Sequence, residues 1–181
     1  MTSSGDFSRQ RSSANSLVVF NASPLILLDQ LDYIPALREL HGAIVIPRAV
    51  SRELGSRPGM PASNVPDLEW VETREVRENI LRRVREGPPA LDAGEAEAIA
   101  LALAERTTVV VDDLRGRERA RRLGVRLTGT LGVLMALHRL DIAEAYSQRG
   151  PEEDLHVLHE AGMRLTDELL SLVLWELRNN G

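Results

Sequence analysis

Five side chains with oxygen donors stand in four separate stretches of the sequence: Asn21, Glu53, Glu95, Asp112 and Asp113. Asn21 and the two aspartates each end a short apolar run, whereas the two glutamates lie in segments with a helical pattern. Carboxylate and amide oxygens are the ligands that Mg²⁺ and Mn²⁺ prefer. Such ions activate water and stabilise charge in phosphodiester cleavage. If folding brings these side chains together, they would form a hard-cation site that is both metal-binding and catalytic.

Each of these residues also has a structural interpretation. Asp92 and Glu95 have the spacing of a capping box at the start of a helix. Asp113 could cap the next helix, and Glu53 could be an ordinary solvated charge on a helix surface. Ser23 stands before Pro24, which favours a helix N-cap over a catalytic nucleophile.

Composition excludes several other classes of site. The chain of 181 residues contains no cysteine, which excludes thiol nucleophiles and Cys-ligated metal centres. All 22 basic residues are arginine, so the lysines of P-loop, Schiff-base and receiver-type phosphorelay sites are absent. The net charge of −5 means that any surface that binds nucleic acid must be local.

The elements that must position these side chains alternate along the chain. Short apolar runs, typical of buried strands, occupy residues 17–20, 43–46, 68–71, 108–111 and 125–127. Helical patterns occupy residues 24–28, 34–40, 47–54, 74–86, 92–105, 116–123, 130–139, 152–161 and 166–177. This alternation predicts an α/β fold with a parallel sheet, in which active groups gather beyond the carboxyl ends of the strands.

The chain reads as one domain preceded by a tail. Residues 1–16 are rich in serine and predict a disordered tail, and residues 17–181 form the predicted domain. No run approaches the ~18 apolar residues of a membrane span. We therefore expect a soluble, cytoplasmic protein.

Five stretches, in order, resemble the motifs of PIN-domain-like proteins, especially the DUF3368 subfamily: residues 18–25, 46–54, 91–99, 111–120 and 124–134. The resemblance implies a three-layer α/β/α fold with a central parallel sheet of four to five strands. It also implies a metal-dependent ribonuclease, commonly the toxin of a toxin–antitoxin pair of the VapBC-like type. The partners implied are RNA and an antitoxin protein.

Carried over by motif, the resemblance implies one or two Mg²⁺ or Mn²⁺ ions held by Asn21, Glu53, Glu95 and either Asp112 or Asp113. The subfamily pattern favours Asp112, while many PIN domains have an acidic residue where Asp113 stands. Ser23 and Thr130 would support the site.

The chain departs from most PIN domains at one position, because Asn21 stands where they have aspartate. An amide oxygen can still coordinate a hard cation, but it brings no negative charge. The alternative function is therefore a catalytically weak or inactive PIN-fold module that binds RNA or protein.

An acidic site needs basic neighbours to hold a polyanion. Arg115, Arg117 and Arg119 follow the fourth motif, and Arg115 and Arg119 share near-helical spacing with Arg122 and Arg126. These arginines predict an RNA-binding stripe, the alternative being a solvated helix with Arg–Glu pairs. Because aromatic residues make up only 3% of the chain, we expect contacts to the RNA backbone rather than base stacking.

The C-terminal stretch 166–177 is apolar on more than one face. This pattern predicts a helix that packs on the flank of the sheet. Contact with an antitoxin or with a second copy in a homodimer stays open as an alternative.

Overall fold

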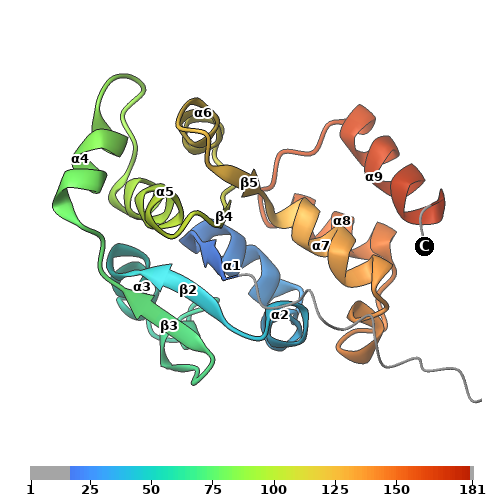
Figure 1. Cartoon of the computed structure of the whole chain (residues 1–181). Coiled ribbons are helices and arrows are strands. Elements are labelled where there is room, and N and C mark those ends of the chain that lie inside the picture. The colour runs from blue at the N-terminus through green and yellow to red at the C-terminus, as the bar shows by residue number, and fades with distance from the viewer. Residues whose placement is uncertain (1–16, 180–181) are drawn as a thin grey trace, which may run out of the picture.

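The central element of the computed structural model is one sheet of five parallel strands in the order β3-β2-β1-β4-β5 (Figure 1). The structure describes residues 17–179, so the predicted tail lies outside the described residues. The strands are β1 (Val18–Phe20), β2 (Ile44–Pro47), β3 (Val71–Arg74), β4 (Thr108–Val110) and β5 (Arg126–Thr128). The predicted α/β class with a parallel central sheet is confirmed.

Helices cover both faces of the sheet (Figure 1). The elements in chain order are α1 (Ala22–Gln30), α2 (Ile34–His41), α3 (Arg48–Gly55), η2 (Val65–Asp67), α4 (Glu78–Arg85), α5 (Ala93–Glu105), α6 (Leu114–Arg122), α7 (Thr130–Arg139), η3 (Ala143–Ala145), α8 (Pro151–Glu160) and α9 (Asp167–Asn179). One core joins the sheet to α1, α2 and α7, and a second joins it to α4, α5 and α6. These two cores make the three-layer arrangement.

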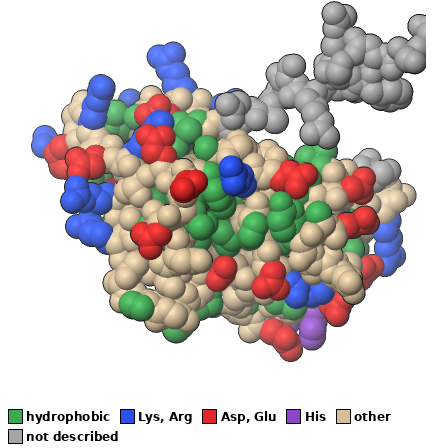
Figure 2. Space-filling model, turned by 90° about the horizontal axis from the view of Figure 1, so that it is seen from below, with side chains coloured by type: hydrophobic (Ala, Val, Ile, Leu, Met, Phe, Trp, Pro, Cys, Tyr) green, Lys and Arg blue, Asp and Glu red, His purple; other side chains and the backbone are tan. Residues whose placement is uncertain are grey.

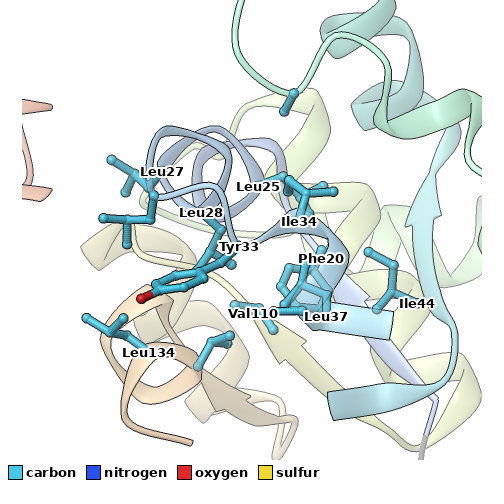
Figure 3. Close-up of a cluster of buried hydrophobic side chains, with 14 of the residues drawn as sticks. Phe20, Leu25, Leu27, Leu28, Tyr33, Ile34, Leu37, Ile44, Val110 and Leu134 are labelled. Atoms are coloured by element: carbon cyan, nitrogen blue, oxygen red, sulfur yellow. The ribbon is translucent and has the colours of Figure 1, made fainter. Parts of the chain in front are cut away.

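Successive side chains of the strands alternate between the two cores. Val19 and Val109 face α5, while Phe20, Ile44 and Val110 face α1 and α2 (Figure 3). Both faces of the central strands β1, β2 and β4 are buried, which explains why these strands read as continuous apolar runs. Full burial of each such side chain contributes about 1.5–3 kcal/mol.

The neighbours of β1 are reached by connections on opposite sides of it. From β1 the chain passes through α1 and α2 to β2 on one side, and after β3 it returns through α4 and α5 to β4 on the other. The Asn21 N–H, just after β1, donates to the Val110 carbonyl of β4 at 3.1 Å. The carboxyl ends of β1 and β4 therefore meet where the strand order reverses, and ligands of such sheets bind in that crevice.

Three predictions about local structure need correction. Helix α1 begins at Ala22 rather than after Ser23, because Asn21 occupies the N-cap position. The strand expected at 68–71 lies at Val71–Arg74, since Val65–Asp67 form a short 3₁₀ helix that delays it.

The third correction concerns α9. It packs against α7 and α8 rather than on the sheet, so it forms an outer layer and leaves Leu172 and Trp175 exposed. Within the described residues, no helix combines the length and apolar composition needed to cross a bilayer.

Candidate functional site

Asn21 lies at the centre of the crevice between β1 and β4. It is 6% exposed and stands at the N-cap of α1, but its side chain makes no capping bond. Its Oδ1 is buried and has no hydrogen-bond partner. A buried acceptor without a partner is rare in proteins and is a place where an ion or an ordered water is expected. Asn21 therefore has the environment of a ligand rather than that of a helix cap.

Gly94, at the start of α5, lets the Asn21 oxygen and the Glu53 carboxylate approach the same point. A Cβ placed on Gly94 would lie 3.1 Å from Asn21 Oδ1 and 3.4 Å from Glu53 Oε2. Glu53 itself is exposed on α3, as the solvated interpretation expects. An open cavity of about 440 Å³ adjoins this point, lined by Ala49, Arg52, Glu53, Asp92, Ala93 and Gly94.

Glu95 has both of the roles that the sequence left open. The capping box is present: the Glu95 N–H donates to Asp92 Oδ1 at 2.7 Å, and the Asp92 N–H donates to Glu95 Oε2 at 3.3 Å. Yet Glu95 is only 6% exposed, and burial, with the Asp92 and Asp113 carboxylates nearby, raises its pKa to about 7. A cap and a candidate ligand are therefore the same side chain.

Asp113 and Asp112 diverge, as neighbouring residues of extended chain do. Asp113 Oδ1 caps α6 by accepting from the N–H groups of Arg115 and Gly116, and the Asp113 side chain also hydrogen-bonds Glu95. Asp112 instead accepts from the N–H of Thr130 at 2.8 Å and from its hydroxyl at 2.5 Å. The structure thus brings Asp113 to Glu95, and it turns Asp112 toward the start of α7.

The acidic side chains of the crevice repel one another. Although Glu53 is exposed, partial desolvation of its carboxylate raises its pKa, the Asp92 carboxylate is the second cause, and Arg57 acts in the opposite direction. Asp92 is thus near both glutamates, and its negative charge raises the pKa of each of them. A bound cation would relieve this repulsion and the cost of burying charge.

The residues fit a hard divalent cation by donor type. The side chains of Asn21, Glu53, Glu95 and Asp113 all offer oxygen ligands, and one of these is the unpartnered Asn21 Oδ1. Across residues 17–179, no group of three or more His, Asp or Glu side chains stands ready to hold a metal ion. The fit therefore rests on the donor set and on the orphaned amide oxygen.

The two predicted supporting residues differ in burial. Thr130 is buried and bonded to Asp112. Ser23 is exposed and faces a second, larger groove of about 1200 Å³. Asp112, Asp113 and Arg117 also line that groove, between β5, α7 and α9.

The predicted stripe of exposed arginines is wrong for Arg119. This side chain is 4% exposed and donates to the backbone carbonyls of Val84, Gly87 and Pro89. It holds the α4–α5 connection against α6. The sequence of α6 could not reveal that Arg119 is buried, because helix propensity and charge spacing do not distinguish a buried arginine from an exposed one.

The other predicted arginines divide between surface and structure. Arg115 is exposed, while Arg117 is half-buried and donates to the Val111 carbonyl at 2.9 Å. Arg122 pairs with Glu118, as the alternative interpretation expects. Arg126 lies on β5, outside α6.

Sequence reasoning missed two sets of basic residues. Arg52 lines the cavity beside Glu53, and exposed Arg82, Arg83 and Arg85 end α4. Figure 2 shows basic side chains grouped at the end of the molecule where α4 lies in Figure 1. The run of arginines at 82–85 was a usable signal for the second set.

In a comparison with protein families, the model of DUF3368, described as a PIN domain, matches residues 17–179. The search of curated proteins found no match to this chain. The matched range begins just before β1 and ends in α9, so it includes the crevice and the groove.

Proposed function

Because the chain belongs to the DUF3368 family of PIN domains, we propose that it is a divalent-metal-dependent nuclease that hydrolyses RNA phosphodiester bonds. The observation that carries this proposal is the buried, unpartnered Asn21 Oδ1, beside Gly94 and near the Glu53 carboxylate of α3. A site of this kind favours a cation that brings its own charge and accepts oxygen ligands.

Asn21, Glu53, Glu95 and Asp113 would hold Mg²⁺ or Mn²⁺. When bound, the ion would lower the pKa of a water molecule and stabilise charge at the scissile phosphate. Glu95, with a pKa of about 7, holds a proton over part of the neutral range and releases it when a cation takes its place. Before a cation binds, the proton on Glu95 can be shared with Asp113 in a hydrogen bond that orients Glu95.

Asp112 has a positioning role in this proposal. Its carboxylate accepts both the N–H and the hydroxyl of Thr130, so it fixes the start of α7 against the end of β4. Arg117 lies beside Asp112 and donates to the Val111 carbonyl. These contacts keep the β4 end rigid where Asp113 follows.

RNA contacts would come from arginines around the crevice. Arg52 lines the cavity with Glu53, and Arg115 is exposed one turn from the site. Guanidinium groups match phosphate geometry, and phosphate contacts carry no sequence preference by themselves. RNA affinity should therefore fall steeply as salt concentration rises.

The test compares the native chain with Asn21→Asp. We expect Mn²⁺ binding by calorimetry and Mn²⁺-dependent RNA cleavage, both stronger in Asn21→Asp because a carboxylate restores charge. Glu95→Ala serves as the inactive control. The enzyme proposal fails if neither the native chain nor Asn21→Asp binds Mn²⁺ or cuts RNA.

A second candidate is a weakly active or inactive binding module, which Asn21 specifically favours. It predicts that the native chain binds RNA without cleaving it, while Asn21→Asp gains cleavage. The toxin role is a further proposal, with the groove lined by Leu169, Leu172 and Val173 as the surface for an antitoxin or a second copy. Growth arrest on expression, relieved by Glu95→Ala, is the expected result for a toxin.

A further inference from the structure

Helix α3, which carries Glu53, is capped by a residue from another helix. Its own N-cap is Pro47, which offers no side-chain bond, so the first N–H groups of α3 need other acceptors. The N–H of Ala49 donates to Oε2 of Glu97 on α5 at 2.8 Å. A carboxylate at a helix N-terminus also interacts favourably with the helix dipole. Glu97 is thus a charged cap supplied across the helix pair.

Two contacts between α3 and α5 lie one helical turn apart. Ala49 and Glu53 are four residues apart on α3, and Gly94 and Glu97 are three apart on α5, so each pair shares one helix face. Ala49 meets Glu97, while Glu53 meets Gly94. The two helices therefore run in opposite directions at this contact, and the pair of contacts sets how far α3 is displaced along α5.

The Gly94 contact alone leaves the position of α3 loosely determined. Gly94 has no side chain to lock against, and the point facing it is the flexible end of Glu53 together with a methyl group of Val50. The Glu97–Ala49 bond instead joins a carboxylate directly to backbone. A directional, charge-assisted bond of this type defines position more closely than apolar contact does.

We propose that Glu97 is a positioning residue for Glu53: by binding the Ala49 N–H it sets the register of α3 on α5 and keeps the Glu53 carboxylate beside Gly94 and the Asn21 oxygen. The inference rests on the proposed metal-dependent nuclease function. Glu97 acts through α3, and it touches neither metal nor RNA.

The test uses Glu97→Ala, Glu97→Gln and a matched control, Asp29→Ala. Asp29 is half-buried like Glu97 and makes the same type of bond, accepting the N–H of Ala62 at 2.8 Å, but in the loop after α3. We expect Glu97→Ala to weaken Mn²⁺ binding about tenfold, as removal of supporting residues around metal sites typically does. Glu97→Gln keeps an acceptor oxygen and should stay within about threefold of the native chain. Asp29→Ala should lower thermal stability without changing Mn²⁺ affinity.

A double-mutant cycle separates positioning from a general loss of structure. If Glu97 acts through Glu53, Glu97→Ala adds nothing once Glu53→Gln is present. Effects that multiply, or native Mn²⁺ affinity in a folded Glu97→Ala, would overturn the proposal.

Hydrogen exchange of the metal-free chain makes the inference independent of the nuclease proposal. The amides of α3 should exchange faster in Glu97→Ala, but not in Glu97→Gln or Asp29→Ala. Unchanged exchange in Glu97→Ala rejects the role of Glu97, whatever the metal experiments show. Faster exchange in a chain whose native form binds no Mn²⁺ rejects the nuclease proposal and retains Glu97 as the residue that positions α3.

Discussion

Two buried carboxylates, Asp154 and Glu95, belong to groups of side chains that are built in opposite ways. Asp154, which is fully buried on α8, accepts hydrogen bonds from Tyr33 at 2.7 Å and from Arg149 at 3.1 Å, and lies 2.8 Å from His138 Nε2. In the crevice, by contrast, carboxylates face other carboxylates, and Asn21 Oδ1 has no partner. A buried charge is tolerated where donors surround it, and it is costly where they do not.

The Asp154 group holds the last helices on the core. It joins Tyr33, between α1 and α2, to His138 on α7, and Arg149 continues to the Leu31 carbonyl and to Asp32. The crevice joins β1, α3, α5 and the start of α6, and the donors to its carboxylates are backbone N–H groups at the starts of α5 and α6. Of these two groups, the one whose carboxylate is surrounded by side-chain donors holds the structure together, whereas the one with the unpartnered Asn21 oxygen forms the candidate site.

The largest effect should come from removing the satisfied group. Asp154→Ala leaves Arg149, Tyr33 and His138 without their shared acceptor, and breaking such a buried pair costs about 3–5 kcal/mol. We expect that loss in the free energy of unfolding, measured by urea denaturation, with cleavage per folded molecule unchanged. Glu152→Ala, which removes an exposed pair with Arg178, is the control and should change stability by less than about 1 kcal/mol. A loss for Asp154→Ala as small as the control's would show that the group is not structural.

Removing the charge of Glu95, a buried carboxylate with other carboxylates nearby, should raise the free energy of unfolding rather than lower it. Because the folded state raises the pKa of Glu95 from 4.5 to about 7, its stabilising contribution is complete below pH 4.5 and is lost as pH rises through 7. Glu95→Gln removes this loss of stability at high pH, because glutamine does not titrate. Its amide oxygen can still accept the Asp92 N–H and so keep the capping box. We expect it to be more stable than the native chain at pH 8, by at most about 3 kcal/mol, while RNA cleavage falls at least about 100-fold. Equal stability at pH 8 would contradict a buried, repelled carboxylate.

The same titration should appear in metal binding. Below pH 7 a proton on Glu95 competes with the cation, so Mn²⁺ affinity should fall by up to about tenfold for each pH unit. Calorimetry between pH 5.5 and 8 measures this slope, and Glu95→Gln should flatten it. A native profile without slope near pH 7 would separate Glu95 from the metal.

The sequence predicted the fold because the strands are buried on both faces. The apolar runs that end at Phe20 and Val111 could only be central strands, and the strand-end rule then located the crevice. Helix starts were predicted less well: Ser23 and Pro24 look like a cap and a first turn, yet the bond from Asn21 to Val110 starts α1 earlier.

The sequence predicted which types of residue form the candidate site, but not the direction in which each side chain points. Spacing cannot tell whether Asp112 or Asp113 points to Glu95, because that depends on where β4 ends and on the Thr130 bond. Nor can it show that the Arg119 side chain turns inward to three backbone carbonyls, since these lie 30 to 35 residues earlier in the sequence. Both outcomes depend on long-range contacts that a local pattern does not contain.

Gly94→Ala should give the smallest effect and the finest comparison. Replacing glycine by alanine in a helix favours folding by up to about 1 kcal/mol. The added Cβ, however, would lie 3.1 Å from Asn21 Oδ1 and 3.4 Å from Glu53 Oε2, so the Asn21 side chain must give way by a few tenths of an ångström. We expect a net change in stability of less than about 1 kcal/mol, with Mn²⁺ affinity lowered several-fold because the new methyl group occupies the space between the two oxygens. Gly55→Ala, where a Cβ meets nothing within 4 Å, is the control and should leave Mn²⁺ affinity unchanged. If Gly94→Ala also keeps native affinity, the space beside Gly94 is packing alone, and the contrast with the Asp154 group would then rest on Glu95 and Asp113.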